Sequence, residues 1–400
     1  MRRKGIFPAS MAGMVSHNSL QHIRLFYAAY FAAMGVILPF FPVYLAGRGM
    51  DVAAVGVFTG LLSVAKVLAP PVVGYALDTH PRPARFILFA SLAAAVLAFS
   101  FPWANSDWFL ALLVLAFGAL WAAVLPLTDG LSVAVSEAAL VDYGRLRVWG
   151  SIGFVVASLF GGVWLADTHA AELPYWLGGL MLLIAFSAKG FPDRHVGGEA
   201  QGVQEGNGRD GPGWLLLAGF VMQASHGAYY GFFSLYLLQA GYSGWQVGGF
   251  WVLGVLAEIV LMWRFSRPVA EASPKVLLSF CLAFAALRWL GLGLTTGLGW
   301  LLLLQLLHAA SFAAFHVNAV TWVQRLAPEH RRASAQGWYS AFGFGLGSAV
   351  GIMGCGWIAT QAGGPADFSS AFFACAVVAL LGIGASLQLP RRRSARLVAG

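Results

Sequence analysis

Long apolar stretches separated by short polar segments run through the whole chain. A helix needs roughly 20 mostly apolar residues to cross a bilayer, and each stretch is about that long or longer. The pattern therefore predicts twelve transmembrane helices. The first six stretches fall at residues 22–46, 52–77, 85–105, 108–136, 145–166 and 173–190, and the second six at 214–240, 246–266, 275–296, 299–325, 333–360 and 367–389.

The composition supports a membrane protein. Of the 400 residues, 59% are hydrophobic and 10% are charged, whereas soluble domains carry roughly 25% charged residues. Water does not solvate such a surface, but lipid does. The formal charge of +8 is spread over short clusters and no basic domain exists, so the sequence does not indicate a nucleic-acid partner.

The polar segment between the two sets, GFPDRHVGGEAQGVQEGNGRDGPG, is rich in glycine and charge and has no apolar period. Such a segment is typical of a flexible linker. The N-terminal segment lacks the apolar core of a signal peptide, and translation could also start at Met11 or Met14. The predicted organisation is an N-tail (1–21), a six-helix bundle (22–190), a linker (191–213), a second six-helix bundle (214–389) and a C-tail (390–400).

The basic residues predict the orientation. When both tails and the linker are placed in the cytoplasm, 21 of the 24 Lys and Arg residues fall on the cytoplasmic side; Lys66 and Arg288 lie deep inside helices, and only Arg48 falls on the other side. This bias follows the positive-inside rule. We therefore expect a multi-pass protein of the bacterial inner membrane with both termini in the cytoplasm.

The two halves of the chain are related by a shift of 192 residues. Residues 40–58 and 232–250 align without a gap, and eight positions are identical: Phe40, Phe41, Tyr44, Leu45, Gly49, Val55, Gly56 and Phe58 meet Phe232, Phe233, Tyr236, Leu237, Gly241, Val247, Gly248 and Phe250. A parallel repeat of two six-helix halves is the plan of major facilitator transporters. The predicted fold class is thus all-α, with twelve transmembrane helices in two pseudo-symmetric six-helix bundles and a substrate site between the halves.

Three charged residues lie deep inside predicted helices: Lys66, Glu258 and Arg288. Each costs roughly 2.5–3.5 kcal/mol at a helix centre, so each should face a wet cavity or an opposite charge. The shift of 192 places Lys66 and Glu258 at the same repeat position. We expect Lys66 to meet substrate or a counter-charge and Glu258 to carry a proton; the alternative is a structural ion pair.

Four further polar side chains inside the helices are candidates for substrate binding: Asp129, His226, His308 and His316. His308 and His316 are eight residues apart, so they share a helix face but lie about two turns apart. That separation is too large for both to hold one metal ion. The alternative for each histidine is a buried packing role.

The remaining patterns indicate packing rather than chemistry. The cysteines Cys281, Cys355 and Cys375 lie in apolar stretches without metal or redox spacing, so we expect no metal, cofactor or disulfide. Glycines repeat every four residues in GFGLGSAVGIMGCG, which favours close helix packing.

No HExxH motif, paired-aspartate motif or cysteine cluster supports an intramembrane enzyme, and the loops are too short for a signalling domain.

Several segments resemble the 3-phenylpropionic acid permease group, in the branch of the major facilitator superfamily that includes lactose permease. They are PLTDGLSVAVSEAALVDYGRLRVWGSIGF, HGAYYGFFSLYLLQAGYS, LAEIV, RWLG and LLHAASFAAFH. The resemblance implies a monomer that performs substrate:proton symport by alternating access. Lactose permease binds sugar through an acidic residue of helix 4 and an arginine of helix 5, and the resemblance implies that Asp129 and Arg147 match this pair. Its helix 9 arginine matches Arg288, and its helix 10 histidine matches His308.

The sequence also departs from lactose permease. The proton-carrying carboxylate three residues after the helix 10 histidine falls on Ser311, and the helix 8 carboxylate position is Val255. Glu258, one turn later, is then the best remaining candidate for the proton. The loop GYALDTHPRPAR keeps Asp78 and Arg85 from the superfamily's loop motif, which suggests a gating role for both.

The charges favour an anionic substrate. Lys66, Arg147 and Arg288 against Glu258 and Asp129 leave one net positive charge. We therefore expect import of a small organic anion, such as an aromatic carboxylate, together with protons. The alternatives are a sugar or nucleoside symporter and a drug exporter of the same fold.

Overall fold

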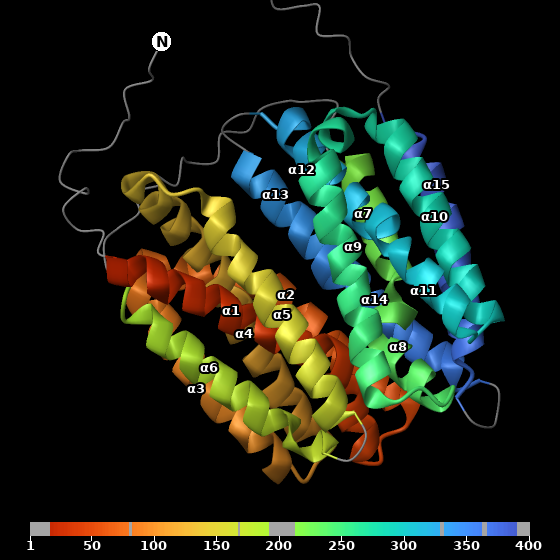
Figure 1. The fold of residues 1–400 in the computed structure, drawn as a ribbon, viewed down its shortest axis with the longest axis horizontal. Coiled ribbons are helices and arrows are strands. Elements are labelled where there is room, and N and C mark those ends of the chain that lie inside the picture. Colours follow the sequence, from red (N-terminus) through yellow and green to blue (C-terminus); the bar gives the residue numbers. More distant parts are fainter. Residues whose placement is uncertain are drawn as a thin grey trace, which may run out of the picture. The chain divides into compact units, whose positions relative to one another are not determined.

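The computed structural model describes residues 17–79, 82–166, 169–191, 213–328, 332–361 and 366–389, which form helices joined by short turns and contain no strand. The helices are α1 (His17–Gly47), α2 (Val52–Thr79), α3 (Pro83–Ser100), α4 (Asp107–Ala139), α5 (Tyr143–Leu165), α6 (Leu173–Ala188), α7 (Gly213–Ser225), α8 (Gly227–Gln239), α9 (Gly244–Glu271), α10 (Pro274–Leu294), α11 (Leu298–Leu306), α12 (Phe315–Leu326), α13 (Arg332–Ser340), α14 (Ser348–Ala359) and α15 (Phe368–Ser386) (Figure 1). Two short 3-10 helices, η1 (Phe101–Trp103) and η2 (Ala170–Glu172), lie between them. Two π-helical segments, η3 (Ala309–Ala314) and η5 (Ala341–Gly347), join α11 to α12 and α13 to α14.

In the described ranges, eleven helical stretches are long and apolar enough to cross a membrane. The remaining predicted stretch, 214–240, is broken into α7 and α8, which have 13 residues each. The break lies at His226, whose φ of −88° and ψ of 4° depart from helical geometry. The prediction of an all-helical membrane protein is confirmed, and its seventh helix consists of two pieces.

The contacts divide the chain into two compact units. Unit 1 comprises Met1–Ile37, Leu68–Ser158 and Glu172–Glu199, and unit 2 comprises Leu38–Val67, Leu159–Ala171 and Ala200–Gly400. The predicted linker at 191–213 and both tails fall largely outside the described residues.

Small residues bring the helices of unit 1 close together. Gly153 of α5 lies against the backbone of Ala28 in α1, and a side chain there would overlap it. Ser158 donates a hydrogen bond to the carbonyl oxygen of Gly35 at 3.1 Å. Gly178 of α6 lies against the ring of Phe99 in α3. These contacts hold α5 on α1 and α6 on α3.

Glycines of the predicted four-residue repeat bring helices together in unit 2. A Cβ atom on Gly347 would lie 2.6 Å from the carbonyl oxygen of Phe220, and one on Gly351 would overlap the backbone of Ala224. A Cβ atom on Gly227, at the start of α8, would in turn overlap the backbone of Gly351. The expectation of close packing is confirmed, since the partner of these glycines is the broken helix α7–α8.

The internal repeat is visible in the turns of the two halves. Gly49 after α1 and Gly241 after α8 are 192 residues apart and have φ angles of +83° and +87°. Only glycine adopts this left-handed conformation without strain. Each turn ends at a helix cap: the Asp51 carboxylate accepts from the Ala54 N–H at 2.7 Å, and Ser243 begins α9 in a capping box with Gln246. The repeated sequence thus forms the same turn twice.

Glycines at repeat-related positions also meet at two helix crossings within unit 2. A Cβ atom on Gly56 of α2 would lie 3.1 Å from the Cα atom of Gly356 in α14. A Cβ atom on Gly162 of α5 would lie 3.2 Å from the Cα atom of Gly248 in α9. Gly56 and Gly248 are again 192 residues apart. Both crossings therefore bring backbone against backbone.

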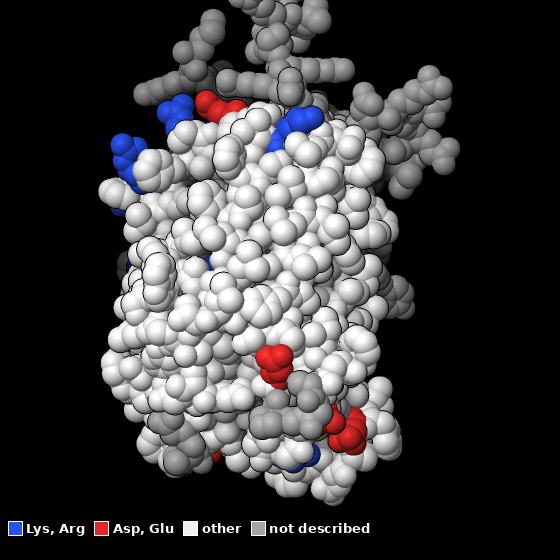
Figure 2. Space-filling model, turned by 90° about the vertical axis from the view of Figure 1, so that its right-hand side faces the viewer, with Lys and Arg blue, Asp and Glu red and all other residues white. Residues whose placement is uncertain are grey.

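The surface fits an apolar solvent. On the face drawn in Figure 2, Lys, Arg, Asp and Glu gather near the two ends, and the broad middle consists almost wholly of other residues. Large apolar side chains such as Phe280 and Leu381 are 59% and 72% exposed. A continuous apolar band of this kind is the face that a membrane protein presents to lipid.

The close contact at Gly351 generates a stability prediction. Replacing Gly351 by alanine forces a methyl group into the backbone of Ala224, and overpacking typically costs about 1–3 kcal/mol. We expect Gly351→Ala to lower the melting temperature of the protein in detergent by several degrees. Gly354→Ala, three residues on in the same helix, meets nothing within 4 Å and should leave the melting temperature unchanged or raise it. Equal melting of the two variants would contradict the packing described here.

Candidate functional site

Three ionisable side chains from different helices meet inside unit 2. Glu258 lies in the middle of α9, Arg288 lies near the end of α10, and His308 lies where α11 passes into the π-helical segment η3. The side chains of His308 and Glu258 are 5% and 15% exposed, and Arg288 has no exposed surface. We refer to Glu258, His308 and Arg288 as the charge cluster.

A chain of hydrogen bonds joins the charge cluster. Arg288 Nη1 lies 3.0 Å from His308 Nδ1, and His308 Nε2 lies 2.8 Å from Glu258 Oε1. A guanidinium has only donors, so Nδ1 of His308 must accept. The proton of the neutral ring then sits on Nε2 and is donated to the Glu258 carboxylate. His308 thus connects a cation to an anion that do not bond to each other directly.

The guanidinium of Arg288 is held by neutral groups. Its Nε donates to the carbonyl oxygen of Leu304 at 3.1 Å and its Nη2 donates to Gln305 Oε1 at 2.5 Å. Its Cζ lies 4.2 Å from the ring centre of Tyr229 and 4.6 Å from that of Trp289. Within the described parts of the chain, no carboxylate lies within 4.0 Å of this guanidinium. A fully buried positive charge therefore lacks a direct ion-pair partner.

Gln305 orients the charge cluster. Besides accepting from Arg288, its amide donates to the Tyr229 hydroxyl at 3.2 Å and to the carbonyl oxygen of Phe250 at 2.8 Å. It has no exposed surface. Gln305 is not among the residues predicted from the sequence. The available signal was an isolated amide in the apolar run LLLLQLLH, three residues before His308.

His226 occupies the break of the seventh helix, next to the charge cluster. Its Nδ1 lies 2.8 Å from the carbonyl oxygen of Met222, so Nδ1 donates and Nε2 is left as an acceptor. Nε2 is buried and has no hydrogen-bond partner. The ring packs edge-on to Trp289, with centroids 4.8 Å apart, and lies 6.1 Å from the ring of His308. Two of the predicted substrate-binding histidines therefore lie close together.

His316 lies farther along the same helix as His308. The rings of His308, Phe312 and His316 stack in a row, with successive centroids 5.3 and 6.1 Å apart and interplanar angles of 10° and 5°. The predicted shared face is therefore present, and Phe312 fills the space between the two histidines. Nδ1 of His316 is buried without a partner.

Lys66 lies apart from the charge cluster. It is half-buried in α2 and makes no hydrogen bond or ion pair with any described residue. Its repeat counterpart Glu258 pairs with His308 instead. The α2 turns around Lys66 pack on η5, where Val67 and Ser63 lie against Gly345.

Asp129 has tyrosine partners in unit 1. Its Oδ1 accepts from the Tyr27 hydroxyl at 2.6 Å and from the Tyr143 hydroxyl at 3.0 Å, and the two hydroxyls lie 3.3 Å apart. The resemblance to lactose permease matched Asp129 with Arg147, and neither tyrosine was predicted. Tyr27 comes from α1, more than a hundred residues earlier, and no local pattern connects it to Asp129.

Arg147 lies on aromatic rings in the same part of unit 1. Its Cζ is 4.0 Å from the ring centre of Phe31 and 5.1 Å from that of Tyr27. Among the described residues, no carboxylate comes within ion-pair distance of it. Tyr27 therefore lies between Asp129 and Arg147, with its hydroxyl on the carboxylate and its ring under the guanidinium.

The remaining candidates lie at the edges of the described structure. Asp78 is in the last turns of α2, but its side chain lies outside what the structure describes. Arg85 is exposed at the start of α3. A metal site of three or more His, Cys, Asp or Glu side chains does not occur within the described ranges.

Comparison with known proteins identifies the family. A model of the MFS_1 like family matches residues 20–371. The chain is 30% identical over 348 residues to the "Probable 3-phenylpropionic acid transporter" of Escherichia coli K12, a match that covers 84% of this chain and 89% of that protein. It is 28% identical over 346 residues to the "Maltose permease" of Geobacillus stearothermophilus, covering 85% and 86%.

The solved structure of the nucleoside transporter NupG superposes with a TM-score of 0.79 at 17% identity and covers 92% of this chain and 98% of that one. This likeness shows a shared fold. The family match spans most of the chain, and the resemblance expected from the helix 4, 7, 8, 9 and 10 segments is confirmed. The chain belongs to the MFS_1 like family and is a multi-pass membrane transporter with the MFS fold, not an enzyme.

Proposed function

We propose that this transporter imports a small aromatic carboxylate together with a proton. The proposal rests on two arginines that contact aromatic rings but no carboxylate. Arg147 in unit 1 and Arg288 in unit 2 each lie against aromatic rings without a carboxylate at ion-pair distance among the described residues. Buried charges are normally paired because desolvation is costly. Arg288 is fully buried and Arg147 is half-buried, and two such cations without a direct partner favour an anion as cargo.

The chemistry of these arginines suits a planar, aromatic anion. A guanidinium binds a carboxylate through two parallel hydrogen bonds. The rings beside Arg147 and Arg288 can in turn pack on an aromatic substrate. We propose that Asp129, His226, His308 and His316 line the substrate path with them. Lys66 adds a third cation without a partner among the described residues, and we propose that it also contacts substrate.

The relatives favour this cargo and keep one alternative. The relative at 30% identity carries 3-phenylpropionic acid in its name, and that compound is an aromatic carboxylate. The maltose permease at 28% identity supports a sugar as the second candidate. Sugar sites need many hydrogen-bonding groups, and buried amide side chains in the described helices are few: Gln223, Gln305 and Asn318. A nucleoside or a drug is a further alternative on the same fold.

Glu258 is the proposed proton carrier because gaining a proton changes its hydrogen bond with His308. His308 already donates through Nε2, since Arg288 occupies Nδ1. A proton added to the Glu258 carboxylate removes its negative charge, and a neutral carboxyl oxygen accepts from Nε2–H more weakly than a carboxylate does. We propose that protonation of Glu258 thereby loosens its bond to His308 and, through His308, the contact with Arg288.

We further propose alternating access as the transport mode, with a single chain as the working unit. Both termini and the segment between the halves lie in the cytoplasm of a bacterium, and Asp78 and Arg85 contribute to gating on that side. The bias of Lys and Arg toward one side supports this orientation.

The proposal predicts which compounds move protons. Cells that produce the protein should alkalinise the medium when 3-phenylpropionate or a related aromatic carboxylate is added, because each anion enters with a proton. Neutral sugars and nucleosides should give no signal and should not compete. Competition by maltose without competition by carboxylates would overturn the anion proposal. Uptake without alkalinisation would overturn proton coupling.

Replacing Glu258 should separate proton coupling from binding. In Glu258→Gln the side-chain oxygen still accepts from His308, but no proton can be gained or lost. We expect vesicles with this variant to exchange labelled carboxylate across the membrane but to lose accumulation driven by a proton gradient. Glu271→Gln, which alters an exposed carboxylate at the end of the same helix, should accumulate substrate like the wild type. Accumulation by Glu258→Gln would exclude Glu258 as the carrier.

Replacing Arg147 should weaken substrate binding. A charge-assisted hydrogen bond contributes about 1.5–3 kcal/mol, so Arg147→Gln should raise the apparent KM for the carboxylate about tenfold or more. Arg147→Lys keeps the charge but not the planar fork, and should recover only part of the affinity. Arg145→Gln removes an exposed arginine two residues away and serves as the control. An unchanged KM in Arg147→Gln would remove this residue from the substrate site.

A further inference from the structure

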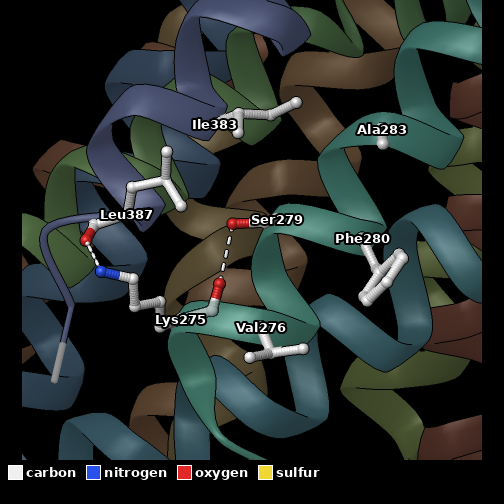
Figure 3. Close-up of a pocket in the computed structure, with 7 residues that line it drawn as sticks. All are labelled: Lys275, Val276, Ser279, Phe280, Ala283, Ile383 and Leu387. Atoms are coloured by element: carbon white, nitrogen blue, oxygen red, sulfur yellow. Dashed lines mark hydrogen bonds between the residues drawn. The ribbon is translucent and has the colours of Figure 1, made fainter. Parts of the chain in front are cut away.

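A groove on the surface of unit 2 lies between the first turns of α10 and the last turns of α15 (Figure 3). Its volume is about 400 Å³ and it is open on one side. The lining is mainly apolar: Lys275, Val276, Ser279, Phe280, Ala283, Ile383 and Leu387. Because α10 and α15 are both membrane-spanning helices, this groove opens toward lipid.

One end of the groove carries a single cation. Lys275, in the first turn of α10, donates from Nζ to the carbonyl oxygen of Leu387 at 2.5 Å (Figure 3). That bond uses one of its three N–H donors. No described carboxylate lies within 4.0 Å of Nζ. Lys275 therefore stands at the end of α15 with two donors left for another group.

The serine in the groove is already satisfied. Ser279 Oγ donates to the carbonyl oxygen of Lys275 at 2.7 Å and lies 2.6 Å from Ser386 Oγ. The other side chains are hydrocarbon, and Val276, Phe280 and Leu387 are 52%, 59% and 46% exposed. The groove thus offers a positive charge at one end and an apolar slot along the rest.

A single positive charge at the end of an apolar slot fits a ligand with an anionic head and a hydrocarbon chain. We propose that the groove binds an anionic phospholipid, with the phosphate at Lys275 and one acyl chain between α10 and α15. Basic residues at the cytoplasmic end of membrane helices attract anionic headgroups, and the proposed orientation places Lys275 on that side. A soluble anion lacks the chain that would cover Val276 and Phe280.

The test measures lipid binding and does not depend on the transported substrate. The full chain is purified in detergent, titrated with phosphatidylglycerol, and the bound copies are counted by native mass spectrometry. One basic side chain near an anionic surface contributes enough for about a fivefold change in affinity. Lys275→Gln should therefore bind the tightest phosphatidylglycerol about fivefold more weakly. Arg264→Gln, which removes an exposed arginine of α9 outside the groove, should bind it like the wild type.

A second variant tests the apolar part of the groove. Ala283→Trp fills the slot without touching the charge, and should also weaken phosphatidylglycerol binding. Melting temperatures of all variants verify that they are folded, and weaker binding by a folded variant supports the site. Equal binding by Lys275→Gln and the wild type overturns the proposal. Equal losses in Lys275→Gln and Arg264→Gln, or displacement of the lipid by glycerol phosphate alone, overturn it as well.

Discussion

The charge of Arg288 is the constraint around which unit 2 is organised. A guanidinium stays protonated in a protein, so burial cannot be relieved by losing the proton. Instead, Leu304, Gln305 and His308 accept its hydrogen bonds and two aromatic faces cover it. Each of these partners is neutral. The compensating negative charge of Glu258 does not contact Arg288 directly, because the His308 ring lies between the two side chains.

The charge cluster lies next to irregular helical geometry. His308 sits where the regular helix passes into a π-helical segment, and π-bulges frequently mark functional sites. Phe312 and His316 follow His308 at intervals of four residues, and the three rings stack in a row. The ring of His226, at the break of the seventh helix, lies 6.1 Å from the ring of His308. The charge cluster thus lies beside two irregular helices rather than regular ones.

Much of this could be predicted from the sequence, for physical reasons. Lipid requires apolar helices of a set length, so the spans follow from hydropathy alone, and the intramembrane charges Glu258 and Arg288 stood out by their cost. The break at His226 could not be predicted, because the segment FVMQASHGAYYGF is mostly apolar on both sides of the histidine and contains no proline. The two π-helical segments likewise have no local signal. The tyrosine partners of Asp129 depend on tertiary packing between α1, α4 and α5, and the repeat relation of Lys66 to Glu258 described equivalent positions rather than neighbours.

The two glycine crossings, Gly56 on Gly356 and Gly162 on Gly248, have an entropic consequence. When two helices meet through side chains, long rotamers are frozen on contact, at a cost of up to about 2 kcal/mol for each residue. Glycine has no side-chain torsion to lose. Parting and rejoining at these crossings therefore changes little apart from backbone contact and lipid exposure. At both crossings, separating the two glycines therefore leaves no side chain of the pair itself to be ordered again when they rejoin.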